Sequence, residues 1–445
     1  MLTWLKSLLA GTLAPTLYTA LFVVFAAAVV KRAEWALYLL VILIPLPVVW
    51  YQLHSLPLGK STLDILILGA TLGIVINKNG FERAPSMVLI GTFMVVSYLA
   101  LWNSSLRFGL PAPLSTDNLL LKDWKNYAEM IFLYFVVYNA IRNEDHQKTV
   151  VLIMATMILL IATREFRNFG EGASFSYDRR SEGPFWIVGL GANHFGAFMA
   201  HYGSLLLGLF LVDKHKYRKW LYLAAAVMSV HPLFFAYSRG AYAAALVALM
   251  AFGFIKKPVL LVLVATLIFT WQVVLPTTVV ERIAMTETAS GEIEESAALR
   301  FGVWQHALGL FQENSLFGVG FNGFGFTLPE GSRLTDTHNF YLKTAAEQGM
   351  VGLTLLAVTL WFALSSGWRL YRRGESDFHR GLGLGFVGCV IAVAVSNVFG
   401  DRWSYFTLGA YFWVAWGLVD RALKLSLPQS DAASIPAAEP RQVPG

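Results

Sequence analysis

The amino-acid sequence predicts an all-α polytopic membrane protein with 12 or 13 transmembrane helices and one large helical loop outside the membrane. Hydrophobic residues make up 56% of the 445 residues and charged residues only 14%, whereas about a quarter of a soluble globular chain is charged. The apolar residues form continuous blocks of about 16–24 residues, which is the length that crosses a ~30 Å hydrocarbon core. A membrane β-barrel would alternate instead. Soluble enzymes, disordered proteins and single-anchor proteins are therefore excluded.

The predicted spans follow the apolar blocks along the chain. They are residues 13–30, 34–52, 62–77, 86–103, 126–141, 148–163, 187–211, 219–236, 240–255, 258–276, 348–369, 381–399 and 404–420. If the first block is re-entrant, twelve spans remain. Residues 1–12 contain one lysine and no small-residue cleavage site, so we expect a mature N-terminus rather than a cleaved signal. The single cysteine, Cys389, excludes an intrachain disulfide and a cysteine-rich metal centre.

Short basic loops alternate with longer and more acidic ones. The basic set comprises residues 31–32, 78–83, 142–148, 214–219, 256–257, 369–380 and 421–424. The positive-inside rule places this set in the cytoplasm. We therefore expect four regions: N-terminal transmembrane helices in 1–276, a large outward-facing loop with amphipathic helices in 277–347, C-terminal transmembrane helices in 348–424, and a disordered cytoplasmic tail in 425–445.

Many arginines lie on the outward side, against the usual charge bias. They are Arg164, Arg167, Arg179, Arg180, Arg239, Arg282, Arg300, Arg333 and Arg402. The guanidinium group binds phosphate oxygens bidentately and stays charged in a partly dry site. The set predicts an anionic, phosphate-bearing ligand; pairing with carboxylates or lipid headgroups is the alternative for each single arginine. Arg239 follows a tight turn between two spans, which favours a position at the mouth of a membrane cavity.

The outward loop 277–347 is too long to be a simple connection. Residues 295–312 have the pattern of an amphipathic helix, with Arg300 and Trp304 one turn apart on one face. Residues 317–326 alternate glycine with phenylalanine and contain G-x-G-x-x-G from Gly318 to Gly323. A dinucleotide-binding fold needs a strand before this motif and a helix after it, so we reject that interpretation and expect a compact loop at the lipid surface.

His338 stands at the end of the outward loop, where a helix enters the membrane. Its unperturbed pKa near 6.5 allows the imidazole to accept a proton at neutral pH. A structural hydrogen-bonding role is the alternative for a lone histidine. The spacing of His338-Asn339 from Gly349-x-x-Gly352 favours the functional role.

This spacing resembles the motif of O-antigen ligases, O-antigen polymerases and bacterial O-oligosaccharyltransferases. The resemblance extends over residues 180–355 and includes three further segments: Arg180 to Gly196, Ser238-Arg239-Gly240, and Arg300 to Gly320. It implies a membrane glycosyltransferase of the GT-C type in the bacterial inner membrane, whose periplasmic active site takes a glycan from undecaprenyl pyrophosphate. O-antigen ligases pass that glycan to a sugar hydroxyl of lipid A–core in lipopolysaccharide biosynthesis, with no metal and no cofactor.

The resemblance also implies residue roles. His338 matches the catalytic histidine, with Asn339, Gly349 and Gly352 as motif support. Arg239, Arg300, Arg180 and Arg282 match the donor pyrophosphate-binding positions. Direct attack at the anomeric carbon predicts inversion. An O-antigen or exopolysaccharide polymerase and a protein O-oligosaccharyltransferase use the same donor and stay open. A lipid-linked glycan flippase is the alternative of another class, although the charges lie at span ends rather than at the bilayer midplane. Membrane lipids are the other expected partners, and nucleic acid is not one.

Overall fold

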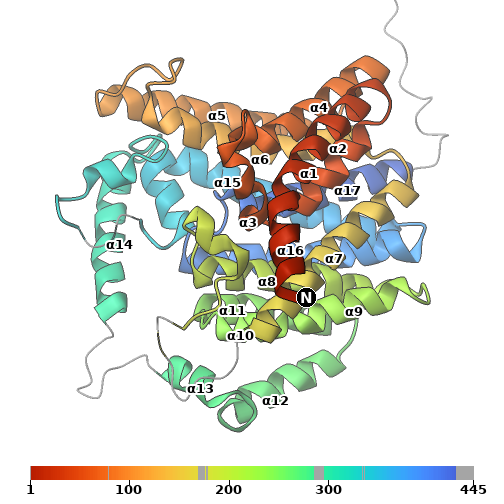
Figure 1. The fold of residues 1–445 in the computed structure, drawn as a ribbon. Helices are drawn as coiled ribbons and strands as arrows, with labels where there is room; N and C mark the ends of the chain where they lie inside the picture. The colour runs from red at the N-terminus through yellow and green to blue at the C-terminus, as the bar shows by residue number, and fades with distance from the viewer. Residues whose placement is uncertain are drawn as a thin grey trace, which may run out of the picture.

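The structure is a computed structural model that describes residues 2–78, 80–168, 176, 179–284, 295–332, 334 and 336–426. Within these residues all regular secondary structure is helical (Figure 1). The first nine α-helices are α1 (Leu2–Val30), α2 (Ala33–Leu43), α3 (Pro47–Trp50), α4 (Thr62–Lys78), α5 (Met87–Arg107), α6 (Leu119–Ala140), α7 (Glu144–Asn168), α8 (Ala192–Val212) and α9 (Arg218–Met228). The tail from residue 427 onward lies outside the described residues.

The second half of the chain contains the remaining helices. They are α10 (Val230–Phe235), α11 (Arg239–Ile255), α12 (Val259–Val274), α13 (Thr277–Ala284), α14 (Glu295–Glu313), α15 (Phe340–Arg373), α16 (Asp377–Ser396) and α17 (Phe406–Leu425). Short 3₁₀ helices η1 to η5 cover Tyr51–Ser55, Gly59–Ser61, Gly183–Val188, Phe324–Thr327 and Asn397–Phe399. A helix, α14, is present where the sequence predicted one in residues 295–312.

The polytopic α-helical class is confirmed, with fewer spans than expected. In the described residues, seven helices are long and apolar enough to cross a membrane, or up to nine if two bent pairs each count as one span. These pairs, Ala33–Leu43 with Pro47–Ser55 and Val259–Val274 with Thr277–Ala284, bend by 102° and 104°. The expected spans 126–141, 219–236, 240–255 and 404–420 are helical but do not meet that criterion. The chain breaks between α9 and α10, α11 has only 17 residues, and α6 and α17 carry charges near their ends.

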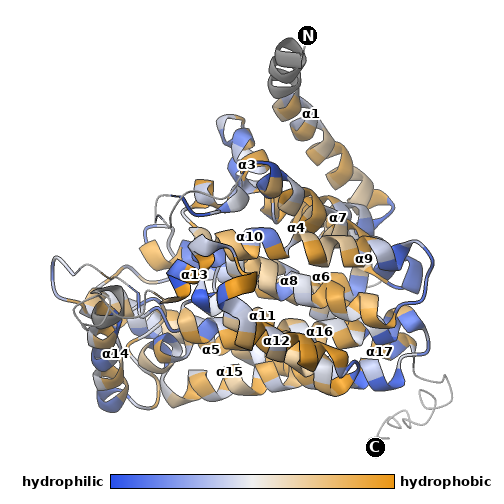
Figure 2. Ribbon diagram, turned by 90° about the horizontal axis from the view of Figure 1, so that it is seen from below, coloured by the Kyte–Doolittle hydropathy of each residue, from blue (hydrophilic) through white to orange (hydrophobic). Residues whose placement is uncertain are grey.

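Helices α8 and α16 form the centre of the bundle. Their apolar segments are 83% and 72% buried, against 11% for α1 at the periphery. Glycines allow close backbone approach between helices in membranes, and a Cβ atom on Gly208 of α8 would lie 2.3 Å from the backbone of Gly385 of α16. Figure 2 shows hydrophobic residues along the bundle helices and hydrophilic residues at their ends.

Helix α14 lies apart from the main bundle. It stands at the left-hand edge in both ribbon views, across the end of the bundle (Figures 1 and 2). The chain then returns through residues 315–324, here called the glycine clasp, which packs against α5 and α15. Phe321 N–H donates to the Ala100 carbonyl of α5 at 2.9 Å, and Gly320 N–H donates to the Glu347 carbonyl of α15 at 2.8 Å.

The clasp pairs with a break inside α15. Gly349 has φ 62° and ψ −157°, so the helix is kinked there, and this left-handed φ favours glycine. The kink frees the N–H of Met350, which donates to the Ser315 carbonyl at 2.7 Å. The Glu347 carboxylate accepts the backbone N–H groups of Asn322 and Phe324 at 3.1 and 3.3 Å. The glycines of the expected compact loop thus serve close backbone contact, while Phe321 and Phe324 are buried.

Replacing Gly349 by alanine is expected to lower the free energy of unfolding by about 1–3 kcal/mol, because a side chain is strained at this φ. The added Cβ would also lie 2.4 Å from the Leu316 backbone. Thermal unfolding in detergent measures the change. Gly309→Ala is the control: it lies inside α14 with no atom within 4 Å of the new Cβ, and alanine favours a helix. Equal losses for both variants would contradict the role of the kink.

Candidate functional site

His338 is held in a constrained turn at the start of α15. Its φ is +50°, an uncommon value for a residue with a side chain. The next residue, Asn339, caps α15: its Oδ1 accepts the N–H groups of Tyr341 and Leu342 at 3.0 and 3.2 Å. The Thr337 hydroxyl donates to the Asn339 carbonyl at 2.8 Å. The motif pair His338-Asn339 therefore combines an N-cap with a fixed imidazole position.

Helix α14 fastens this turn from the other side. The indole N–H of Trp304 donates to the Thr337 carbonyl at 2.8 Å. Arg300 lies one helical turn before Trp304, and its charge acts on His338. The predicted Arg300–Trp304 face thus performs two tasks, because one residue positions the histidine turn and the other brings positive charge to it.

The charges around His338 favour its neutral form. Burial lowers the pKa of the imidazole, and the nearby Arg300 and Arg402 guanidinium groups lower it further; Asp336 acts in the opposite direction. The net pKa lies below its ordinary value of about 6.5. At neutral pH the ring is therefore uncharged and can accept a proton.

Arg402 is a part of this site that the sequence motif did not identify. It is only 6% exposed, and burial lowers the pKa of its guanidinium to about 10, against the opposing effect of Asp401; it stays protonated at neutral pH. Asp401 forms a buried ion pair with Lys343 at 3.1 Å. Burial alone would raise the pKa of Asp401, but Lys343 and Ser404 hold it below its ordinary value.

A sequence signal for Arg402 existed. Asp401 and Arg402 are the only charged residues between Arg380 and Asp420. A lone charged pair in a short turn between two apolar spans is costly unless it has a role. Its place among the expected outward arginines put Arg402 on the same side as His338 but did not connect the two residues.

A second group of arginines surrounds the turn before α11. Arg180 Nη2 donates to the Asn193 side chain at 2.6 Å and to the Ala236 carbonyl at 2.7 Å. These bonds hold the turn in which Tyr237 has φ +49°. The Tyr237 hydroxyl in turn contacts Thr278 of α13 at 2.8 Å. Arg180 is thus committed to shaping the turn, in addition to adding charge.

Arg239 and Arg282 complete this second group. Arg239 is the first residue of α11, and Gly240 lets this helix start close to Phe399, because a Cβ there would lie 2.5 Å from the phenylalanine Cβ. Arg282 lies on α13 and is 7% exposed. Its charge and that of Arg180 both reach the Tyr242 hydroxyl.

The start of α8 connects the two groups. Asn193 accepts the bond from Arg180, and the adjacent His194 lies within electrostatic reach of both His338 and Arg402. The His194 ring also packs on Tyr405, the residue before α17, with centroids 4.9 Å apart. Helices α8, α11, α15 and α17 therefore all begin at this site. Their N-terminal ends add partial positive charge to that of the arginines, which suits an anionic ligand.

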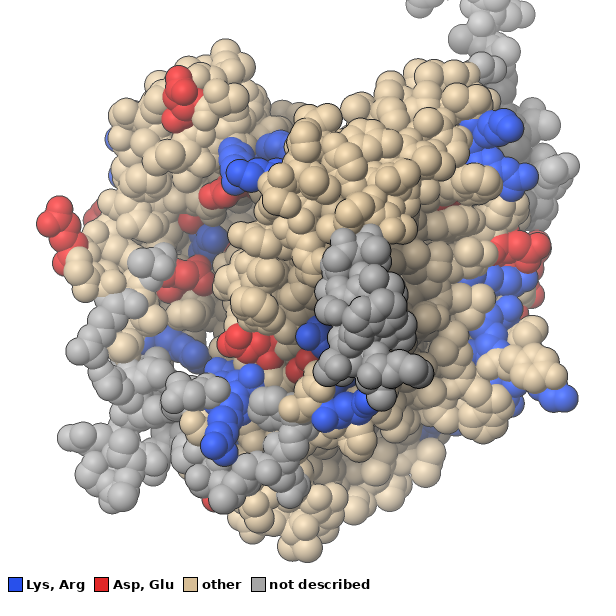
Figure 3. Space-filling view, viewed as in Figure 1, with Lys and Arg blue, Asp and Glu red and all other residues tan. Residues whose placement is uncertain are grey.

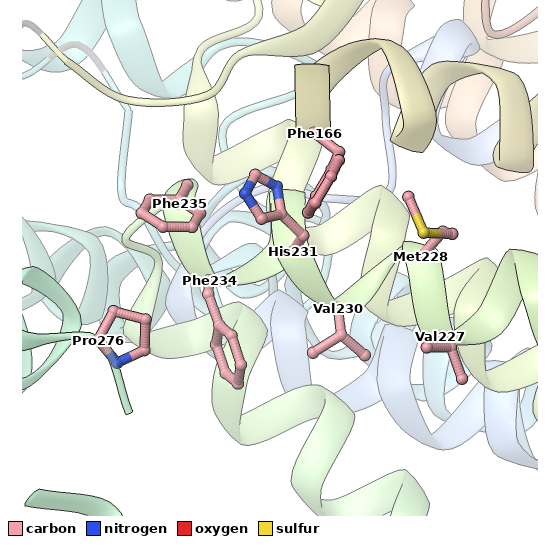
Figure 4. A pocket seen from close by; sticks show the side chains of 8 residues that line it. All are labelled: Phe166, Val227, Met228, Val230, His231, Phe234, Phe235 and Pro276. Atoms are coloured by element: carbon pink, nitrogen blue, oxygen red, sulfur yellow. The ribbon is translucent and has the colours of Figure 1, made fainter. Parts of the chain in front are cut away.

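An apolar groove of about 500 Å³ adjoins the turn. It is lined by Phe166, Val227, Met228, Val230, His231, Phe234, Phe235 and Pro276 (Figure 4). Phe235 connects the groove to the arginines, since its carbonyl accepts the Ser181 N–H at 2.9 Å and Ser181 follows Arg180. Elsewhere in the described part of the chain, no three His, Cys, Asp or Glu side chains gather closely enough to hold a metal ion together.

Fold and site together define a multi-pass α-helical membrane protein with a cationic, partly buried site at one end of its bundle. Residues 224–357 match the family model described as O-antigen ligase. The match supports the resemblance to the O-antigen ligase and polymerase superfamily inferred from the sequence, and it includes Arg239, Arg282, Arg300 and His338. It covers less than half of the chain and leaves out Arg180 and Arg402. No curated protein matches the chain significantly.

The charges around His338 can be tested without a substrate. Arg300→Gln is expected to raise the pKa of His338, because a repulsive positive charge is removed; Asp336→Asn is expected to lower it, because an attractive negative charge is removed. NMR titration of ¹³C-labelled histidine in detergent micelles measures both, with His338→Asn assigning the resonance. Shifts of the same sign in both variants, or none, would show that these side chains do not surround the imidazole.

Proposed function

We propose that the protein is an O-antigen ligase of the bacterial inner membrane. It transfers a glycan from undecaprenyl pyrophosphate to a sugar hydroxyl of lipid A–core on the periplasmic side, in GT-C fashion and without a metal. The observation that carries this proposal is His338, which lies inside the segment that matches the ligase family, is held in a constrained turn at the start of α15 and is within electrostatic reach of Arg300 and Arg402. The basic loops favour a cytoplasmic position for the opposite end. Residues 277–347 are then the periplasmic loop between two transmembrane regions, 1–276 and 348–424.

In the proposed reaction, the acceptor hydroxyl oxygen attacks the anomeric carbon as the bond from that carbon to the phosphate oxygen breaks. The hydroxyl proton passes to a nitrogen of the neutral His338 imidazole, and undecaprenyl pyrophosphate leaves with the electron pair. Attack opposite the leaving group inverts the anomeric configuration. His338 acts as general base, and the arginines stabilise negative charge as it develops on the leaving pyrophosphate.

The arginines of the site take three different parts in this proposal. Arg239, Arg282 and Arg300 contact the pyrophosphate, since each brings charge to the end where four helices begin. Arg180 also lies at this end, but its bonds to Asn193 and the Ala236 carbonyl make it a positioning residue for the turn. Arg402, buried and within electrostatic reach of His338, supplies further positive charge and adds to the effect of burial, which is the main cause of the lowered pKa of the imidazole.

The apolar groove suits the polyprenyl chain of the donor. It opens beside the turn that carries Arg239, so a lipid whose pyrophosphate reaches the arginines can lay its first isoprene units against Phe234 and Val230. Burial of apolar surface contributes about 25 cal/mol per Å². The groove therefore offers binding energy at a distance from the reacting bond.

Transfer from a lipid-linked glycan to lipid A–core in the presence of EDTA tests the reaction directly. His338→Ala is expected to reduce transfer about 10²–10⁴-fold, as loss of a general base does, and Arg239→Ala about 10²–10³-fold, as loss of an electrostatic contact does. Arg164→Ala, an exposed arginine of α7 on the same side, is the matched control and is expected to stay active. Size-exclusion profiles confirm that the variants fold.

Each other outcome has a definite meaning. Longer donor-linked chains without lipid A–core conjugate identify a polymerase, and transfer to protein identifies an O-oligosaccharyltransferase. Movement of the donor across vesicles without transfer identifies a flippase. Full activity of His338→Ala would contradict the base assignment, and loss of activity in EDTA that a divalent cation restores would contradict the metal-free mechanism.

The groove has its own test. Val230→Trp fills it and is expected to raise KM for an undecaprenyl-linked donor about tenfold, because apolar contacts worth about 0.8 kcal/mol per CH₂ are lost. The KM for a donor in which a methyl group replaces the whole polyprenyl chain is expected to stay near the wild-type value. Leu263→Trp, on the exposed face of α12 outside the groove, is the control. An equal KM increase for long and short donors would rule out a chain-binding role.

A further inference from the structure

A second cavity lies at the opposite end of the bundle, where the basic loops gather. Its volume is about 570 Å³. Four parts of the chain surround it: the end of α8 with the loop to α9, the turn between α11 and α12, the end of α15, and the start of α16. Figure 3 shows Lys and Arg side chains along the right-hand edge of the molecule, which is the end where α8 leads into α9 in Figure 1.

The cavity carries an excess of positive charge. Five cations line it, Lys214, Lys219, Lys256, Lys257 and Arg380, against two carboxylates, Asp213 and Asp377. Neither carboxylate pairs with Lys219, Lys256 or Lys257. Asp213 is bound by Arg218 through two hydrogen bonds of 2.6 and 3.0 Å, and Asp377 pairs with Arg380 and Lys214.

In the part of the chain that the structure describes, three of these lysines therefore have no carboxylate counter-ion. Among the described residues, Lys219, Lys256 and Lys257 form no ion pair with a carboxylate. Basic residues elsewhere at this end show the contrast: Arg421 and Lys424 both bind Glu82, at 2.8 and 2.6 Å. Basic residues that only fix the orientation of the protein in the membrane do not need to line a single cavity, as these lysines do.

The surroundings of the cavity are apolar on the membrane side. Its inner wall includes Phe210 and Leu211. Lys257 leads into α12, of which only Val264 is buried, so that helix presents its apolar side chains outward. Val259, directly beyond the lysines, is 66% exposed. A ligand here meets cations at one end and a surface suited to acyl chains at the other.

We propose that this cavity binds the phosphate headgroup of an anionic membrane phospholipid, with the acyl chains lying along α12. Basic pockets between helices at a membrane interface recognise such headgroups. The lysines supply point charges to the phosphate oxygens, and the lipid supplies the negative charge that the described carboxylates do not bring to Lys219, Lys256 and Lys257. This inference does not depend on the proposed transferase activity.

Native mass spectrometry of the full-length protein in detergent tests the proposal. The wild type is expected to retain phosphatidylglycerol or cardiolipin in preference to phosphatidylcholine. The triple variant K219Q/K256Q/K257Q is expected to bind the anionic lipids at least about tenfold more weakly, since each lysine near a phosphate contributes attraction. The charge-matched control K31Q/R32Q/R83Q removes three exposed cations from other basic loops and is expected to bind like the wild type.

Three results would overturn the proposal. They are equal lipid binding by the triple variant and the wild type, no preference of the wild type for anionic lipids, and an equal loss in the control variant. An arm with inorganic phosphate separates the two sources of the same chemistry. If free phosphate displaces the lipid at equal concentration, the site is a phosphate site rather than a lipid site.

Discussion

Irregular backbone that is buried must have its hydrogen-bonding groups satisfied, because neither packed protein nor hydrocarbon offers water to do so. Much of the backbone in and next to the candidate site is irregular. It comprises the segment with Arg180 and Ser181, the Tyr237 turn, the glycine clasp and the His338 turn. Side chains from distant parts of the sequence supply the missing partners. Arg180 donates to the Ala236 carbonyl, Glu347 accepts from the clasp, and Trp304 donates to the Thr337 carbonyl. These bonds join the irregular segments to the helices that surround the site.

This dependence gives the same residues both structural and electrostatic roles. The helix that supplies Trp304 to the His338 turn also supplies Arg300 to the charge around the imidazole. The loop that brings Arg180 to the Tyr237 turn is fixed in its place by Ser181, which bonds both Glu165 and the Phe235 carbonyl. Removal of one of these side chains therefore changes both the backbone geometry and the electrostatic potential of the site. The effect of charge alone is best measured with variants of similar size and shape.

The sequence predicted the helical membrane class because long apolar blocks have few other solutions, and it predicted α14 because Arg300 and Trp304 recur at helical spacing. The sequence predicted 12 or 13 spans, whereas seven helices of the described residues, or up to nine with the bent pairs, are long and apolar enough to cross a membrane. The hydropathy of the apolar blocks alone does not reveal the break between α9 and α10 or the bends after α2 and α12. The two bends fall at Pro45, Pro47 and Pro276, and proline interrupts a helix. The grouping of His338 with Arg300 followed from a motif. Arg402 escaped because its proximity to His338 arises from the folding of α16 and α17 against α15, which no local pattern encodes.

The kink at Gly349 divides α15 into a part long enough to cross a membrane and a shorter part that carries the chain back to His338. After the kink, residues 350–373 extend about 36 Å at 1.5 Å per residue, enough to cross a hydrocarbon core of about 30 Å on their own. The ten residues before it, from Asn339 to Gln348, extend the chain about 15 Å further. Under the proposed function, this length places His338 beyond the hydrocarbon, at the level of the lipid headgroups. The proposed acceptor sugar can then reach the imidazole without entering hydrocarbon, while only the polyprenyl chain of the proposed donor stays within the bilayer.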